Sequence, residues 1–523
     1  MNPLASTKCV RLVLMALTAI AGIFLTVGCG GSNSSPATNP VGFSNSSLNG
    51  TYVFSSQGLD NGGAPLNVAG TFVANGNAGI TGGTIDIVDA GFPSIPTTTA
   101  QPITSGSYSV NSDGRGRASL TSAYGTYTLD FVLTSTSQGL VTEFDGNGGG
   151  SGTIDMQTAI TSLTGSYAFS LAGSDAGGNS FAAAGAFTLN SSGTITTSVE
   201  DFNDDGAVLN EPPTGTATLG SGTGPGAIPL TSTSFPNNSF DFYPIDSTHW
   251  KIIETDYNNF LAGDAFSQTS TSIPTGTMAF TMSGGISAPV ANGGFLTYNG
   301  TSFSGSEDFN NNGNFVQQVA FTGAAGAVGP VGGRVVVGPL SDFTPATQLV
   351  VYPSSGGLLM LETDGLNVTN GAAYVQQSGA ALSSSQAYGF NLNAFNTSGP
   401  FLENDIAQFT TASTGLNGVI DISDNFGNGS ISLVSQTLGG TYTIDSPATG
   451  RGEVSTTANG SGYVSFIFYA VSNDQFLVLE TDSIQIGAGT FEAQSASGSA
   501  AVSQAHMSFA HPVVKAHAAS RRK

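Results

Sequence analysis

The sequence predicts an all-β protein built from four tandem antiparallel repeats, and three observations support this fold class. Glycine accounts for 72 of 523 residues and charged residues for only 9%, a composition that favours short strands and tight turns over helices. A strand-like stretch that ends in Glu-x-Asp occurs four times. Other landmarks recur in the same phase. We therefore expect four up-and-down β-barrel-like repeats of about 110 residues, with β-sandwich repeats as the alternative.

The Glu-x-Asp stretch sets the repeat length. Its copies occupy residues 140–145, 251–256, 359–364 and 477–482. The steps from one Glu to the next are 111, 108 and 118 residues, which is the size of a small domain and too long for a propeller blade. Each copy precedes a Gly and, five residues later, a Gln: Gln157, Gln268, Gln376 and Gln494.

Three further landmarks accompany this stretch in every repeat. The opening strands lie at residues 50–54, 165–169, 276–280 and 386–390. A second strand centres on Phe72, Phe187, Phe295 or Phe409, and acidic turns follow at 86–91, 201–206, 308–313 and 421–427. The first repeat contains eight strand-like runs, and eight short antiparallel strands close most economically into a barrel without edges. We expect the Glu-x-Asp stretch to be the penultimate strand of each barrel.

These landmarks divide the chain into seven segments. They are a signal peptide (1–29), a flexible tether (30–47), four β repeats (48–158, 163–269, 274–378 and 385–495) and a basic, disordered tail (496–523).

The N-terminal segment resembles the signal of bacterial lipoproteins. Lys8 and Arg11 precede 16 apolar residues (12–27), too few for an ordinary membrane-spanning helix. The sequence LTVGC at 25–29 is similar to a lipobox, which implies cleavage before Cys29, its lipidation, and attachment to the membrane through that N-terminal lipid. Gly30 after the cysteine implies a location at the outer membrane or cell surface. An ordinary signal peptide or an uncleaved anchor is the alternative.

The repeats resemble calycin-type barrels, the lipocalin and avidin group. The GTY and GSY sequences at 50–52 and 165–167 sit where those families begin their first strand. The resemblance implies barrels that enclose a lumen.

The charge distribution excludes nucleic acid as a partner. All 34 acidic residues lie between Asp60 and Glu492, a region with only five basic residues. Phosphate binding requires clustered Lys and Arg. A surface glycan, a protein ligand or divalent cations remain compatible with this charge.

The Glu and Asp of each Glu-x-Asp stretch share one face of a strand, with Cα atoms roughly 6.5–7 Å apart. Such a pair could act as the acid and base of a glycosidase. Its recurrence in every repeat favours a structural role. Three arginines precede the repeat's Glu by 28 or 29 residues, which predicts the ion pairs Arg115–Glu143, Arg334–Glu362 and Arg451–Glu480. The second repeat has Gly226 at this place, and Lys251 should face away from Glu254.

Two acidic turns resemble the first half of a calcium loop. Oxygen ligands at positions one, three and five are Asp201, Asn203 and Asp205, and Asp308, Asn310 and Asn312. The Glu expected at position twelve is missing from both, and the same residues also suit plain hairpin turns. No other cofactor is predicted.

We expect a non-enzymatic protein. The repeats contain one His, His249, and no Cys, so neither a Ser/His/Asp nor a Cys/His set can be assembled. The favoured function is binding or adhesion at the bacterial cell envelope through repeated modules. The alternatives are a carrier of small apolar ligands in the barrel lumens and a structural surface coat. An open apolar lumen indicates a carrier, whereas a lumen filled by Phe and Tyr indicates adhesion.

Overall fold

A computed structural model of the chain describes residues 42–91, 100–146, 148–342, 346–397, 402–425, 430–446 and 449–496. The predicted signal peptide with Cys29, most of the tether, part of the fourth acidic turn and nearly all of the tail lie outside these residues. The described residues belong to one compact unit, Asn39–Lys523. Their single helix is the short 3-10 turn η1 (Asn45–Ser47). None of the described residues forms a helix long and apolar enough to cross a membrane.

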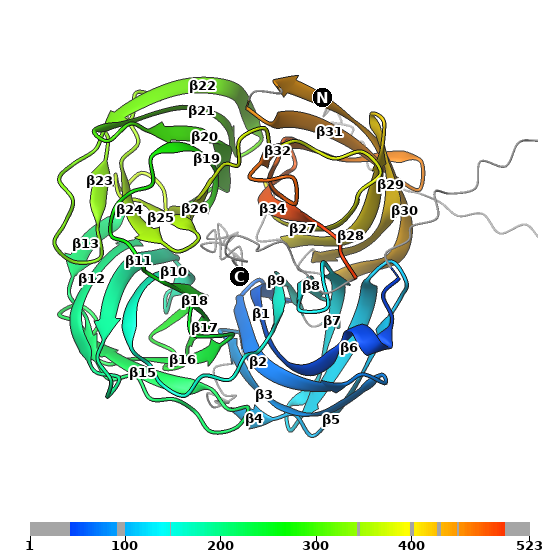
Figure 1. Cartoon of the computed structure of the whole chain (residues 1–523), viewed down its shortest axis with the longest axis horizontal. Coiled ribbons are helices and arrows are strands. Elements are labelled where there is room, and N and C mark those ends of the chain that lie inside the picture. Colours follow the sequence, from blue (N-terminus) through cyan, green and yellow to red (C-terminus); the bar gives the residue numbers. More distant parts are fainter. Residues whose placement is uncertain are drawn as a thin grey trace, which may run out of the picture. The chain divides into compact units, whose positions relative to one another are not determined.

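Barrel 1 is a closed antiparallel sheet. Its strand order is β2-β1-β9-β8-β7-β6-β5-β3, with β2 also paired to β3 and the short β4 added to β3 (Figure 1). The strands are β1 (Asn49–Asp60), β2 (Pro65–Asn75), β3 (Gly79–Asp89), β4 (Gln101–Pro102), β5 (Ser105–Val110), β6 (Arg115–Ser122), β7 (Gly125–Leu133), β8 (Gln138–Glu143) and β9 (Gly148–Met156).

Barrel 2 follows the same order, but among the described residues its two sides meet only through the isolated bridge of Thr194 with Thr216, which lie next to β12 and β14. The strands are β10 (Gly165–Asp175), β11 (Ser180–Leu189), β12 (Ile195–Asp204), β13 (Ala207–Glu211), β14 (Thr214–Gly215), β15 (Gly226–Thr231), β16 (Asn238–Pro244), β17 (His249–Glu254) and β18 (Asn259–Ser267).

Barrel 3 has eight strands, and Ala325 bridges to Val337 between its outermost strands. The strands are β19 (Gly276–Gly284), β20 (Val290–Tyr298), β21 (Ser302–Asn311), β22 (Asn314–Ala324), β23 (Val335–Val337), β24 (Leu349–Ser354), β25 (Gly357–Glu362) and β26 (Thr369–Val375).

Barrel 4 is closed by continuous pairing of eight strands. They are β27 (Ala387–Asn396), β28 (Leu402–Ala412), β29 (Gly415–Asn425), β30 (Ser430–Ser446), β31 (Arg451–Ala458), β32 (Ser461–Ala470), β33 (Gln475–Glu480) and β34 (Gln485–Ala493). The predicted fold class, all-β with repeated antiparallel up-and-down barrels, is confirmed. The Glu-x-Asp strand is the penultimate strand of every barrel: β8, β17, β25 and β33.

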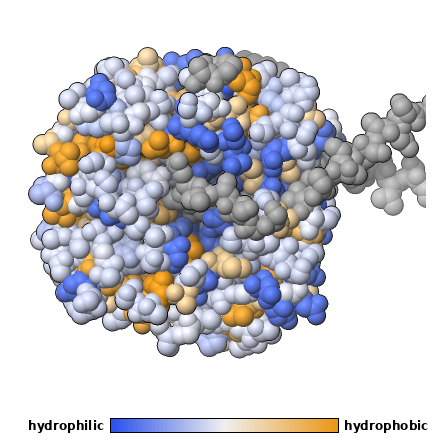
Figure 2. Space-filling model, in the orientation of Figure 1, coloured by the Kyte–Doolittle hydropathy of each residue, from blue (hydrophilic) through white to orange (hydrophobic). Residues whose placement is uncertain are grey.

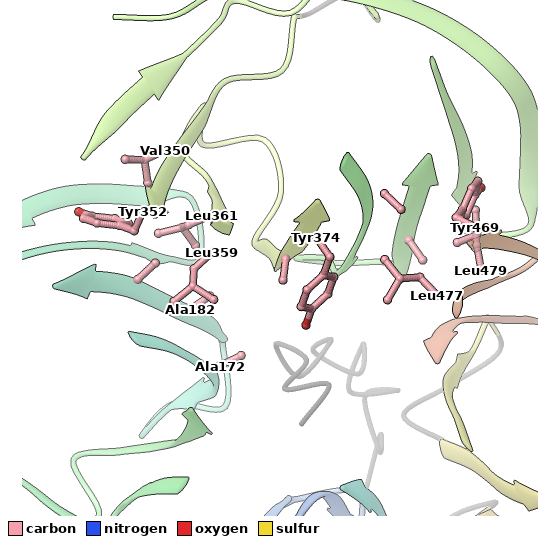
Figure 3. Close-up of a cluster of buried hydrophobic side chains, with 14 of the residues drawn as sticks. Ala172, Ala182, Val350, Tyr352, Leu359, Leu361, Tyr374, Tyr469, Leu477 and Leu479 are labelled. Atoms are coloured by element: carbon pink, nitrogen blue, oxygen red, sulfur yellow. The ribbon is translucent and has the colours of Figure 1, made fainter. Parts of the chain in front are cut away.

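Alternation along the strands produces two kinds of core. Inward side chains fill a separate hydrophobic cluster in each lumen. Outward side chains form a cluster shared by barrels 2, 3 and 4, in which Ala182, Leu359 and Leu477 come from three different barrels (Figure 3). Smaller outward clusters join barrel 1 to barrel 2, through Val53 and Ile253, and barrel 1 to barrel 4. Each barrel therefore contacts the next one, and barrel 4 contacts barrel 1.

Candidate binding site

The lumen of barrel 3 contains a cavity of about 380 Å³, a size typical of small-ligand sites. Its lining includes residues from all eight strands. Most of the wall is apolar, formed by residues such as Phe280, Met282, Leu296, Phe303, Val351 and Met360.

Smaller side chains explain why this lumen is open. Strand register places Leu349 opposite Glu362, and the equivalent partners of the repeated Glu are Phe240 in barrel 2 and Phe466 in barrel 4. Two further lumen positions follow the same rule. Val351 corresponds to Phe242 and Phe468, and Leu358 corresponds to Trp250 and Phe476. Three lumen positions that are aromatic in barrels 2 and 4 are thus aliphatic in barrel 3. This difference is visible once the repeats are aligned, but sequence reasoning missed it.

Aromatic rings fill the lumens of barrels 2 and 4. In barrel 2 the ring centroid of Trp250 lies 4.1 Å from that of Tyr167 and 4.9 Å from that of Phe242. In barrel 4 the centroids of Phe476 and Phe491 are 4.5 Å apart, and a cavity lined by its lumen residues measures only about 10 Å³. Aromatic burial of this kind stabilises the barrels but leaves little room for a ligand.

Barrel 1 has a second cavity of about 630 Å³ at one end. Its lining includes the carboxyl groups of Asp60, Asp89, Glu143 and Asp145, so this cavity is also partly acidic. Tyr127 donates a hydrogen bond to Glu143 Oε2 at 3.1 Å.

The repeated Glu of every barrel is buried and faces the lumen. Burial is the main cause that raises the pKa of Glu143, Glu254, Glu362 and Glu480, and the Asp two residues later is the second. For Glu362 the pKa rises to about 8. Burial and the neighbouring carboxyl group therefore disfavour ionisation of each of these Glu side chains.

The predicted Arg–Glu pairs are replaced by Arg–Asp pairs between barrels. Arg334 binds Asp201 of barrel 2 (Nε–Oδ2 2.5 Å, Nη2–Oδ1 2.6 Å). The other two arginines behave in the same way: Arg451 binds Asp308 of barrel 3 at 2.9 and 3.0 Å, and Arg115 approaches Asp421 of barrel 4 at 3.4 Å. The physical reason is strand orientation, since the expected partners Glu143, Glu362 and Glu480 point into the lumens.

At the contact between barrels 1 and 2, none of the described arginines has this role. Asp86 accepts a hydrogen bond from Tyr243 Oη at 2.6 Å, and Asp241 lies beside it. Burial is the largest cause that raises the pKa of Asp86, to about 8, and the neighbouring Asp241 is the second.

In the second repeat, Gly226 holds the place that the arginine has in the other three. It lies opposite Phe242, and a Cβ atom on Gly226 would come within 2.2 Å of the phenyl ring.

Lys251 does face away from Glu254. Its ammonium group is completely buried and lies 2.7 Å from Asp264 Oδ1, which is also 2.7 Å from His249 Nε2. The group formed by Lys251, Asp264 and His249 is separate from the contacts that the three arginines make.

The repeated Gln side chains also join neighbouring barrels. Gln157 Nε2 donates to the carbonyl oxygen of Pro244 at 2.8 Å, and Gln494 Nε2 donates to that of Leu133 at 2.7 Å. Gln268 and Gln376 make the equivalent bonds to Pro353 and Ala470. Barrel 4 therefore binds barrel 1 with the same side chain that joins consecutive barrels.

The candidate calcium ligands are engaged in protein contacts. Both oxygens of Asp201 and of Asp308 bind the arginines. Asn203 and Asn310 donate to backbone carbonyls of the next barrel, including those of Glu362 and Glu480. Asp205 and Asn312 have φ of 49° and 50° and each precedes a Gly with positive φ, as in a hairpin turn. Among the described residues, no group of three or more His, Cys, Asp or Glu is placed to hold a metal ion.

Comparison with known proteins assigns no family. No family model and no curated protein matches the chain. Solved structures with partial similarity include the intact Ap-TbpB with its N and C lobes (TM-score 0.18, 7% identity, 89% of this chain and 98% of that chain). A double mutant of transferrin binding protein B from Haemophilus parasuis Hp5, described as a vaccine antigen, gives a TM-score of 0.17, 8% identity and the same coverage. CghA gives a TM-score of 0.14 and 8% identity, over 66% of this chain and 95% of that chain. These TM-scores are too low to assign the chain to any of these families.

Proposed function

We propose that this protein is a non-catalytic binding protein of the bacterial cell envelope that holds a small, mainly apolar ligand in the lumen of barrel 3. The observation that carries the proposal is the apolar cavity of about 380 Å³, at positions where barrels 2 and 4 hold aromatic rings. Burial of apolar ligand surface in such a site contributes roughly 25 cal/mol per Å². The carrier interpretation therefore has more support than adhesion for this barrel.

A fluorescent apolar probe tests the proposal. N-phenyl-1-naphthylamine should bind the full chain at one high-affinity site. Val351→Phe places an aromatic ring at the position that corresponds to Phe242 and should lower the affinity at least tenfold. Val316→Phe is the matched control, because Val316 is an exposed residue of the same barrel. Equal probe binding by both variants and the wild type would exclude the lumen as the site.

Adhesion through the outer surface is the second proposed function, supported by the filled lumens of barrels 2 and 4. On the face drawn in Figure 2, hydrophobic residues lie in separate areas between polar ones, which favours a polar ligand such as a glycan over a broad apolar contact. A glycan array with the full chain, with and without calcium, tests this function and the calcium prediction together.

The envelope location is proposed from the lipobox-like sequence. Lipidation of Cys29 would attach the barrels to a membrane through residues 30–47. Incorporation of labelled palmitate, lost in Cys29→Ala, is the expected result. Equal labelling of this variant would exclude Cys29 as the attachment point.

A further inference from the structure

The apolar cavity of barrel 3 has carboxyl groups in its lining. Glu307 on β21 and Glu362 on β25 face the lumen and are only 4% and 6% exposed. Asp342 also lines the cavity, and its carboxyl group interacts directly with that of Glu307. Among the described residues, the lining contains no Lys, Arg or His, so none of these basic side chains neutralises Glu307 or Glu362 there.

The hydrogen bonding of Glu307 is incomplete. Its Oε2 accepts a hydrogen bond from Asn292 Nδ2 at 2.8 Å, whereas its buried Oε1 accepts none from the described residues. Glu362, by comparison, accepts hydrogen bonds from Thr369 at 2.5 Å and Asn367 at 3.5 Å. A buried carboxyl oxygen without a donor is costly, and a ligand that brings donors would remove this cost.

The adjacent residue shows how the same chain treats a buried acid that has a structural role. Asp308 faces the outside of barrel 3, where both of its oxygens bind Arg451. Glu307 faces the inside, with no such cation. Successive side chains of a strand point to opposite faces. Arg451 therefore binds the acid on the outer face of β21, whereas the acid on the inner face, Glu307, lines the cavity.

We propose, on the basis of the function proposed above, that the barrel 3 ligand is an amphiphile with a primary ammonium group, which Glu307 and Asp342 bind while the apolar wall holds the hydrocarbon part. An ammonium group supplies three hydrogen-bond donors and one positive charge, which matches a pair of adjacent carboxyl groups. A fatty acid would add a third acid to this pair, and an alcohol would supply one donor and no charge.

Proton release is a direct consequence of this arrangement. Burial, together with the neighbouring Asp342, raises the pKa of Glu307 to about 8. Asp308 on the same strand also raises it, and Asn292 on β20 faces the group without charge. At pH 7 the empty site therefore holds a proton that an entering ammonium group displaces. Amine affinity should rise with pH up to about 9 and fall when the amine itself loses its proton near pH 10.

Displacement of N-phenyl-1-naphthylamine by decylamine, decanol and decanoate tests the inference on the full chain. We expect decylamine to bind at least tenfold more tightly than decanol at pH 8.5. At pH 6 the two affinities should differ less than threefold. Glu307→Gln and, independently, Asp342→Asn should each reduce the ratio of amine to alcohol affinity at least fivefold. Glu211→Gln, at a carboxyl group outside barrel 3, should keep the wild-type ratio.

The outcomes separate the two proposals. Equal affinities for amine and alcohol in the wild type, or an unchanged ratio in both cavity variants, would overturn amine recognition and leave apolar binding intact. Amine recognition would also be overturned if Glu307 bound calcium or magnesium but not decylamine. If no decyl compound displaces the probe, and the Val351→Phe variant binds the probe with wild-type affinity, the function proposed for barrel 3 fails as well.

Discussion

Arg451 of barrel 4 binds both carboxylate oxygens of Asp308 in barrel 3, and the Tyr469 hydroxyl donates to the same carboxylate at 2.6 Å. Both charged side chains are almost completely buried. Two charge-assisted hydrogen bonds in parallel compensate the desolvation of both ions. The same arrangement, with Arg334, Asp201 and Tyr352, joins barrels 2 and 3.

Removal of one partner should leave a buried charge without compensation. Arg451→Ala is expected to cost about 3–5 kcal/mol of unfolding free energy, because Asp308 stays buried. Glu453→Gln, at a residue that lies 3.3 Å from Arg451 and is much more exposed, should cost less than about 1 kcal/mol. Urea denaturation of the two variants measures the difference. Losses of equal size would show that the pair does not stabilise the contact.

The contact between barrels 1 and 2 should make stability depend on pH. The pKa of Asp86 is raised to about 8 and that of Asp241 to about 6, so the folded protein binds more protons than the unfolded chain above pH 4. The stability that these two groups contribute is therefore fully present below about pH 4 and is lost as the pH rises through about 6 and 8.

Thermal unfolding at pH 5 and pH 8.5 checks this sign. We expect a lower midpoint at pH 8.5, and a smaller difference between the two pH values in Asp86→Asn. The exposed Asp474→Asn serves as the control and should keep the wild-type difference. A midpoint that rises with pH would contradict the assignment.

Trp250→Leu should open the lumen of barrel 2, because it introduces the residue that barrel 3 has at Leu358. We expect a loss of about 2–4 kcal/mol from the lost contacts and the new cavity. Leu209→Ala, an exposed truncation in the same barrel, should stay within about 0.5 kcal/mol. The variant should also gain a second site for N-phenyl-1-naphthylamine. An unchanged probe stoichiometry together with unchanged stability would contradict the aromatic filling of this lumen.

Gln494→Ala should weaken the contact between barrels 4 and 1. The side-chain amide donates to two carbonyl oxygens, those of Asp113 and Leu133, and its loss leaves both without this donor. We expect a cost of about 1–3 kcal/mol and faster hydrogen exchange in β7 and β8. The exposed Gln317→Ala provides the matched control. Exchange rates that stay equal in both variants would show that barrel 1 is held without this residue.

The fold class could be predicted from the sequence because strand periodicity and turn residues are local signals. The Glu-x-Asp strand was placed correctly for the same reason. The partners of Arg334 and Arg451 could not be found in this way. Their constant distance to the next Glu in sequence reflects the repeat phase, whereas their partners Asp201 and Asp308 lie 133 and 143 residues earlier, in another barrel.

The open lumen of barrel 3 was also missed. The count of 33 Phe residues in the whole chain favoured filled barrels, but a cavity depends on which positions are aromatic. Only a comparison of Leu349, Val351 and Leu358 with the same positions in barrels 2 and 4 reveals the missing volume. The lipidation of Cys29 stays a prediction, since that residue lies outside the described residues.

Gln494 and Phe43 both lie beside Gly114, and the backbone N–H of Ser495 donates to the carbonyl oxygen of Thr134 at 2.8 Å. The beginning and the end of the barrel array are thus neighbours on barrel 1. A circular permutant that starts with barrel 2 and carries barrel 1 last, after barrel 4, would need only a short linker and would keep all four contacts between barrels. The covalent order of the barrels and their spatial order are therefore separable properties of this chain.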